Sequence, residues 1–212
     1  MKAKNFINRI TVSSIIMAVI IVFSTIPQLV KAQVNYKLAA GPDVSIKVLG
    51  SSNIHDWTMA ATGIESQGDF KFEGGQLRSL HSFNLSVEVK SLKSEHSSMD
   101  SRTYKAINAD KYPSVSYKLS SAVVTLVQKN KYLIKATGDL TISGATQTVV
   151  LNVTAVVNPD NTITCTGSQK IQLTDYKIAP PTFMLGAMKV YNDLTIQYNL
   201  VYKSNQLLTK NN

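Results

Sequence analysis

The sequence predicts an all-β domain: an extended antiparallel β-barrel of about eight strands with one short helical insertion near residues 97–109. Apolar and polar residues alternate over many short runs, as they do in strands that bury one face. Turn-forming residues separate these runs, and no helical pattern alternates with them, which indicates hairpins rather than parallel crossovers. The runs extend over about 8 to 11 residues, a length that favours a closed barrel because closure removes exposed edges.

The first three predicted strands each place apolar side chains on one face and polar side chains on the other. Their apolar positions are Val44, Ile46 and Val48, then Phe70 and Phe72, then Phe83, Leu85, Val87 and Val89. Asp69 falls in the polar phase of the second strand, so we expect it on the solvent face. Gly74 and Gly75 mark the turn that follows.

The helical insertion is predicted where the alternation stops, between Ser94 and Ala109. Ser97 or Ser98 would cap the helix, with Asp100 in its favourable first turn. Pro113 ends any helical segment. The residues expected on one helix face are Met99, Thr103, Ala106 and Ile107.

The remaining strands continue the alternation to residue 202. Their apolar positions are Val115, Tyr117 and Leu119; Tyr132, Ile134, Ala136, Leu140 and Ile142; Val149, Leu151, Val153, Ala155 and Val157; Ile163, Cys165, Ile171 and Leu173; and Leu194, Ile196, Tyr198, Leu200 and Tyr202. Turn signals lie between them at 128–131, 143–144, 158–161 and 191–193. No internal repeat or linker divides residues 33–212, which we therefore expect to form a single domain.

Residues 1–32 have the layout of a cleavable signal peptide. A basic start precedes an apolar run over 10–22, which is shorter than the roughly 20 residues that span a bilayer. Small or β-branched residues, Val30 and Ala32, stand at the positions before the expected cleavage. The sequence therefore predicts export to the periplasm or secretion.

Removal of this segment changes the charge of the protein. The 212 residues include 22 Lys and Arg against 13 Asp and Glu, a net charge of +9. Four of the basic residues lie in 1–32, so the mature chain carries +5, spread singly along the sequence. A nucleic-acid binder would show a basic cluster, so we expect no nucleic-acid partner. Weak attraction to anionic lipid leaves room for transient contact with a membrane surface.

Catalytic and metal sites find little support in the sequence. The three histidines show no pairing at metal-ligand spacing, and no Ser stands in a Gly-x-Ser-x-Gly turn. The single Cys165 cannot form an internal disulfide, and we expect it to be a small buried hydrophobe. We predict no catalytic residues, no metal and no cofactor, with His55 and Asp56 as the remaining polar candidates near an opening of the barrel.

The segment from Pro180 to Met188 is an apolar loop without charge. Loops normally run over the surface and are polar. This one is expected either to plug the end of the barrel or to line the mouth of an apolar cavity, and plain core packing remains an alternative.

Several segments between Val34 and Tyr202 together resemble the YceI-like proteins, exported bacterial proteins with a lipocalin-like barrel. The most specific are the end of the helical insertion, Asp110–Tyr117, and the Gly138–Thr146 hairpin, which resembles Gly-x-Leu-Thr-Ile-x-Gly-Val-Thr. The remaining segments are Ser45–Trp57, whose His-Asp-Trp is a branch variant, Gly68–Phe70 with Gly74-Gly75, Val87–Leu92, and Met99–Asp100. Met99 stands where the family commonly has Arg, and Arg102-Thr103 replaces His-Leu, which bears on ligand contacts at the barrel mouth.

The resemblance implies a non-enzymatic protein that holds a long apolar lipid, a polyisoprenoid or isoprenoid quinone, in the pore for transport, storage or presentation. The residues that we expect to contact this lipid are Val44, Ile46, Val48, His55, Trp57, Phe83, Leu85, Val87, Tyr117, Leu140, Ile142, Phe183, Met184 and Met188. Two alternatives stay open: a structural or interaction module whose barrel is filled by side chains, and an enzyme that uses His55 and Asp56. The oligomeric state also stays open, a homodimer included.

Overall fold

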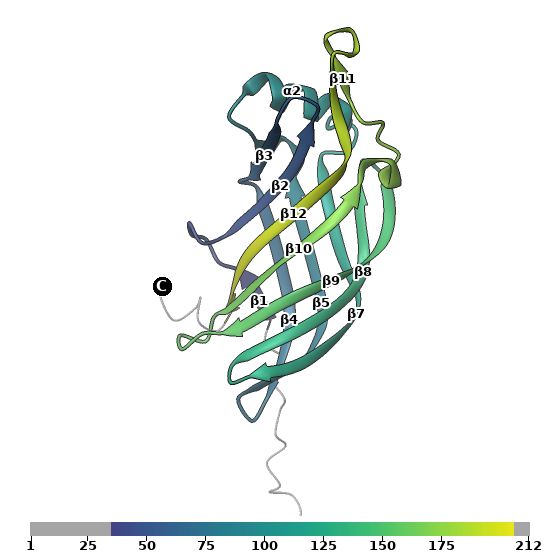
Figure 1. Ribbon diagram of the computed structural model, residues 1–212. Helices are drawn as coiled ribbons and strands as arrows, with labels where there is room; N and C mark the ends of the chain where they lie inside the picture. The colour runs from purple at the N-terminus through teal and green to yellow at the C-terminus, as the bar shows by residue number, and fades with distance from the viewer. Residues whose placement is uncertain (1–34, 206–212) are drawn as a thin grey trace, which may run out of the picture. The chain divides into compact units, whose positions relative to one another are not determined.

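The computed structural model describes residues 35–205, which form an antiparallel sheet of 12 strands closed into an eight-stranded barrel (Figure 1). The strands are β1 Asn35–Leu38, β2 Ser45–Ser52, β3 Asp56–Ala61, β4 Ile64–Glu73, β5 Gln76–Glu88, β6 Leu92–Lys93, β7 Ser114–Gln128, β8 Lys131–Ile142, β9 Ala145–Val157, β10 Ile163–Gln172, β11 Thr182–Phe183 and β12 Met188–Ser204. The helical segments are η1 Val89–Ser91, α2 Ser97–Ala106, η2 Leu173–Tyr176 and η3 Met184–Gly186. The predicted signal peptide lies outside the described residues.

Strand β12 closes the barrel by pairing with different partners along its length. β10 runs along one edge of β12. On the other edge, β2 pairs with the first part of β12, with Ile46 opposite Tyr198, and β1 pairs with the last part, with Tyr36 opposite Ser204. β1 also pairs with β4, which completes the circle, while β3 and β6 extend the sheet beyond β2.

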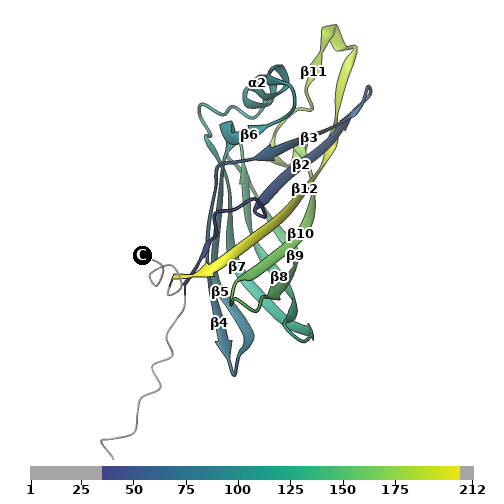
Figure 2. The same ribbon diagram turned by 90° about the vertical axis from the view of Figure 1, so that its left-hand side faces the viewer.

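The two ends of the barrel differ. The helix-covered end carries α2 together with the β2–β3 turn and β11, and the hairpin end carries the β4–β5, β7–β8 and β9–β10 turns (Figures 1 and 2). At the hairpin end Asn130 and Asn161 adopt positive φ, as the turn signals there predict. Among residues 35–205, no helix has the length and apolarity needed to cross a membrane.

The predicted long alternating strands are confirmed, and most extend further than the sequence suggested, up to 17 residues in β12. β1, β3, β6 and β11 were not predicted, because each is short or lacks a clear alternation. The exposed position expected for Asp69 is wrong, because Asp69 is only 3% exposed although Phe70 and Phe72 keep the inward phase that was predicted. β4 and β5 shift register beside it, between Gly68 and Phe70, where the extra residue lies on β5.

The helical insertion is confirmed, although its cap differs from the prediction. α2 covers Ser97–Ala106, and His96 rather than Ser97 or Ser98 occupies the N-cap position, without a side-chain cap. The Asp100 carboxylate instead accepts hydrogen bonds from the Ser94 amide at 2.8 Å and the Ser94 hydroxyl at 2.7 Å. The helix start is therefore tied to the preceding loop.

A chain of aromatic rings fills the barrel towards the hairpin end. Tyr36 and Phe70 pack edge to face with centroids 5.4 Å apart, and Phe70 and Tyr202 lie 5.6 Å apart. Phe83 contacts Tyr202 at 5.8 Å and Tyr117 at 6.2 Å, so the rings extend to the middle of the barrel. Aromatic side chains bury large apolar areas, and this end is tightly packed as a result.

Candidate ligand-binding cavity

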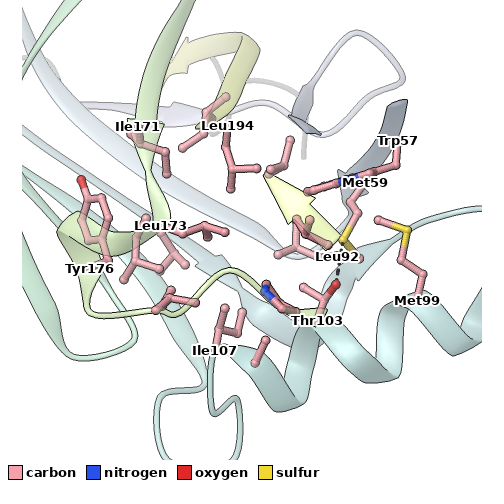
Figure 3. A pocket seen from close by; sticks show the side chains of 18 of the residues that line it. Trp57, Met59, Leu92, Met99, Thr103, Ile107, Ile171, Leu173, Tyr176 and Leu194 are labelled. Atoms are coloured by element: carbon pink, nitrogen blue, oxygen red, sulfur yellow. Dashed lines mark hydrogen bonds between the residues drawn. The ribbon is translucent and has the colours of Figure 1, made fainter. Parts of the chain in front are cut away.

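An apolar cavity of about 350 Å³ occupies the helix-covered end of the barrel (Figure 3). Its wall comes from β2, β3, β5 to β10 and β12, and α2 covers it. The volume lies at the lower end of the range of small-molecule sites. β9 and β10 pair over only four residues, so the barrel widens towards this end and η2 contacts β9 beside the opening.

The barrel wall of the cavity follows from the period-two alternation of the strands. Inward positions two residues apart contribute successive side chains, as Ile46 and Val48 do on β2. The other strand residues of the wall that follow the same rule are Leu85 and Val87, Val115 and Tyr117, Leu140 and Ile142, Gln169 and Ile171, and Leu194, Ile196 and Tyr198. Nearly all of them are aliphatic or aromatic, so the wall favours an apolar occupant.

The cover of the cavity is one face of the helical insertion. Met99, Thr103, Ala106 and Ile107 all line the cavity, which confirms the shared face that the sequence predicted. In Figure 3 the Met99, Thr103 and Ile107 side chains point from the helix towards the strands. The Thr103 hydroxyl lies 3.5 Å from the Met59 sulfur on β3 and links helix to wall.

A second contact of α2 with the barrel comes from Tyr104. Its hydroxyl shares its proton between the main-chain oxygens of Leu92 at 2.6 Å and Lys90 at 2.9 Å. The cover is therefore held by Tyr104 near its end and by Asp100 at its start.

Polar side chains gather at the mouth of the cavity. His55, His96, Ser98 and Arg102 line it and are exposed. The Arg102 guanidinium lies 4.7 Å from the ring centroid of Phe183, in cation–π geometry. This rim offers hydrogen-bond donors and a positive charge next to an apolar interior, an arrangement that can orient an amphipathic molecule.

His55 and Asp56 do not form a catalytic couple of imidazole and carboxylate. The His55 Nδ1 lies 2.7 Å from the main-chain oxygen of Asp56, so this nitrogen carries the proton and donates. The Ser52 hydroxyl in turn donates to the main-chain oxygen of His55 at 3.0 Å. These bonds tie the β2–β3 turn. Among residues 35–205, no group of three or more His, Cys, Asp or Glu is placed to hold a metal ion.

Tyr117 and Tyr198 lie at the bottom of the cavity. Both also line a smaller apolar cavity of about 50 Å³ on the hairpin side. The Tyr117 hydroxyl donates to the main-chain oxygen of Ala136 at 3.1 Å. Burial, with a smaller effect of the Asp139 charge, raises the pKa of Tyr117 to about 12, and burial likewise raises the pKa of Tyr198. Both phenols are therefore neutral at physiological pH.

Two buried donors on the cavity wall, Trp57 Nε1 and the Tyr198 hydroxyl, have no hydrogen-bond partner within the described part of the chain. Trp57 lies opposite Gly50, where a Cβ would overlap its indole ring. Such donors cost free energy when they stay unpaired, so each is a candidate contact for a polar atom of a bound molecule.

The structure brings most of the predicted contact residues together. Those that line the cavity are Ile46, Val48, His55, Trp57, Leu85, Val87, Tyr117, Leu140, Ile142, Phe183 and Met188. Val44, Phe83 and Met184 do not. Val44 precedes β2, Phe83 lines the smaller cavity, and Met184 is 70% exposed at the tip of the β11–β12 connection.

Among the ligand contacts, sequence reasoning missed Met59 on β3 and the residues of α2 and η2. Met59 lies on a strand that was not predicted, and η2 contributes Leu173 and Tyr176 through a short helical turn. Ile171, Leu194 and Ile196 also line the cavity; they were assigned to the apolar phases of their strands but not selected as ligand contacts. The available signal was that each lies on the apolar face of its own strand.

A model of the YceI-like domain matches residues 43–202 of the chain. The chain belongs to the YceI-like family. BcnA of Burkholderia cenocepacia shares 20% identity with it at a TM-score of 0.60, over 74% of this chain and 95% of BcnA. A polyisoprenoid-binding domain from Saccharophagus degradans, implicated in plant cell wall breakdown, shares 13% identity at a TM-score of 0.60, over 80% of this chain and 98% of that domain. These two structures show the YceI-like fold, and no curated protein matches the sequence.

Proposed function

We propose that this YceI-like protein is exported and holds a long apolar lipid, a polyisoprenoid or an isoprenoid quinone, without catalysing a reaction on it. The observation that carries the proposal is the cavity of about 350 Å³, whose wall is almost wholly apolar and which α2 covers. The polyisoprenoid-binding relative from Saccharophagus degradans supports the ligand class. Such a protein carries, stores or presents a lipid that water does not dissolve.

The energetics favour a chain-like ligand. Burial contributes roughly 0.8 kcal/mol for each CH₂, so each five-carbon isoprene unit contributes about 4 kcal/mol before the costs of association. The head group would lie at the mouth, where Arg102, His55 and His96 offer a charge and hydrogen-bond donors. The protein therefore distinguishes the two ends of its ligand.

Contact with a membrane surface fits the same end of the molecule. Leu185 is fully exposed, Met184 is 70% exposed, and Ile54 on the β2–β3 turn is 58% exposed. Asn53 joins the two tips: its side chain donates to the Ala187 oxygen at 2.8 Å and accepts from the Lys189 amide at 2.7 Å. An apolar tip beside the cavity mouth can enter the lipid interface from which an insoluble ligand is drawn.

The Met184 and Leu185 backbone supports this reading of the tip. Both residues have positive φ, 54° and 55°, a conformation that non-glycine residues seldom adopt. The turn directs two large apolar side chains away from the barrel rather than into it. The expectation that the apolar loop lines the mouth therefore applies to Phe183 and Met188, while its tip points outward.

The test is to identify what the mature protein carries. The full chain is expressed, the exported fraction is purified, and bound lipid is analysed by native mass spectrometry and organic extraction. We expect an isoprenoid in near-stoichiometric amount and an N-terminus at Gln33. Delipidated protein should regain melting temperature on addition of a prenol or quinone but not of a short alcohol. A protein that carries no lipid and gains no stability from either compound would contradict the binding proposal, and a retained N-terminal segment would contradict cleavage.

A further inference from the structure

Two tyrosines separate the cavity from the smaller cavity beneath it. Leu85, Leu151, Tyr117 and Tyr198 line both spaces and thus form the boundary between them. Below this boundary the smaller cavity continues along Phe70, Ile134, Cys165 and Leu200. The two apolar cavities are therefore separated at this one level of the barrel.

Glycines on the barrel wall make room for both rings. Gly167 faces inward on β10, directly opposite Tyr198 on β12, and a Cβ there would overlap the Tyr198 hydroxyl. Gly138 faces inward on β8, and a Cβ there would lie 2.7 Å from the Tyr117 ring. Each tyrosine ring thus packs against the barrel wall at a glycine, where no other side chain occupies the space.

The two rings are held differently. Tyr117 is fixed by its hydrogen bond to the Ala136 oxygen and by edge-to-face contact with Phe83. The Tyr198 hydroxyl is buried and has no hydrogen-bond partner among the described residues, so packing alone holds this ring. Removal of the Tyr198 ring therefore breaks no hydrogen bond and opens the boundary.

We propose that Tyr198, supported by Tyr117, forms a floor that limits the length of the chain that the cavity accepts. The proposal rests on the lipid-binding function above. Leu200 lies two residues beyond Tyr198 on β12, about 6.6 Å further along the strand. That depth corresponds to slightly more than one isoprene unit, so opening the floor lengthens the preferred ligand by about one unit.

The experiment measures affinity for all-trans prenols that differ by one isoprene unit. Trp57 is the only tryptophan of the chain and lines the cavity, so its fluorescence reports occupancy. For Tyr198→Ala we expect the optimum to move to a longer prenol, which binds about tenfold or more tighter than it does to the wild type. Tyr198→Phe keeps the ring and should keep the wild-type optimum.

Two controls distinguish a floor that limits ligand length from a general enlargement of the cavity. Leu194→Ala enlarges the cavity above the floor and should change affinity without moving the optimum. In Tyr198→Ala, a second substitution Leu200→Phe refills the space below and should restore the shorter optimum. Tyr198→Leu replaces Tyr198→Ala if the latter does not fold. An unchanged optimum in a folded Tyr198→Ala or Tyr198→Leu protein would overturn the proposal.

A parallel series of straight-chain alkanols distinguishes failure of the floor from failure of the lipid assignment. If alkanols show the length limit and its shift in Tyr198→Ala while prenols do not bind, the floor stands and the isoprenoid assignment fails. If prenols bind with no length limit, the floor fails and the assignment stands. Absence of binding in both series contradicts both.

Discussion

The two ends of this barrel are built from the same alternating pattern but use it differently. At the hairpin end the inward positions carry large rings such as Tyr36, Phe70 and Tyr202, which contact one another and are almost fully buried. At the helix-covered end they carry aliphatic side chains that leave a cavity of about 350 Å³. Side-chain size on a common scaffold therefore separates a stabilising region from a binding region.

The hydrogen bonding of buried polar groups also differs between the two ends. At the hairpin end two buried tyrosine hydroxyls are paired, Tyr202 with Ser66 at 2.8 Å and Tyr132 with the Leu77 amide at 3.1 Å. At the cavity, Trp57 Nε1 and the Tyr198 hydroxyl lack partners within the described residues. Unpaired donors destabilise a fold unless another molecule satisfies them, as expected of a binding site.

The largest expected effect tests the hairpin end as the stabilising region. Phe70 is 1% exposed and contacts two other rings, so Phe70→Ala should lower the free energy of unfolding by about 3 to 5 kcal/mol. Ile171→Ala, on the cavity wall, should cost about 2 kcal/mol, because its side chain already borders open space. Urea denaturation measures both. Equal losses would remove the distinction between the two ends.

A second prediction concerns the tip of the helix-covered end. The double substitution Met184→Ser and Leu185→Ser should reduce binding to vesicles of phosphatidylglycerol and phosphatidylcholine about tenfold, because two exposed apolar side chains no longer enter the interface. Val123→Ser with Val127→Ser is the matched control on the outer face of β7, where exposure is 64% and 60%. A similar loss in the control would place membrane contact elsewhere.

The third prediction concerns the interactions of Asp100 that fix the start of α2 over the cavity. Burial alone would raise the pKa of Asp100, but the hydrogen bonds from Ser94 and the charge of Lys93 outweigh it and lower the pKa. A lowered pKa stabilises the fold above the pKa of an unfolded Asp, about 3.9, and this stabilisation is lost as the pH falls through the folded value. We therefore expect the protection factors of the amides of residues 97–106, which compare their exchange with the intrinsic rate at the same pH, to fall as the pH drops below about 3.9.

Asp100→Asn should accelerate the same amides several-fold already at neutral pH, since it removes the charge that Ser94 and Lys93 stabilise. Asp110→Asn is the control, because Asp110 pairs with Lys90 in an exposed ion pair of little energetic weight. If Asp100→Asn leaves exchange in α2 unchanged, the carboxylate does not hold the cover.

The smallest effect is expected at Cys165. Burial raises the pKa of its thiol to about 12, so the reactive thiolate is scarce and inaccessible in the folded protein. A thiol reagent at pH 8 should leave the native protein unmodified and label it fully in denaturant. Rapid labelling of the native protein would show that the packed part of the barrel opens.

The sequence predicted the scaffold well, because alternation determines which side chains share a face. Alternation placed Ile46, Leu85 and Leu140 on the apolar faces of their strands, and in the structure these faces line the cavity. The helix face that covers the cavity could also be predicted, because the spacing of Met99 and Thr103 places both on one side of the helix. These features depend on local periodicity, which the chain displays directly.

Other features depend on contacts between distant strands. The floor arises because Gly167 and Gly138 leave room for Tyr198 and Tyr117, and the register that brings these pairs together is set by the whole barrel. The burial of Asp69, beside a register shift between β4 and β5, was likewise not visible in the alternation. A glycine on the inward face of a strand indicates room for a large neighbouring side chain. The sequence does not identify that side chain, because the tyrosine that fills the room lies on another strand.

The central claim is that an apolar chain occupies the helix-covered end of the barrel. A prenol that carries a photoreactive diazirine in its chain, crosslinked to the delipidated protein and mapped by peptide mass spectrometry, tests it most directly. We expect saturable labelling of cavity residues such as Met59, Met99 and Leu194, which unlabelled prenol suppresses. Labelling confined to the exposed apolar residues Val123, Val127 and Val150 of the outer face would contradict the claim.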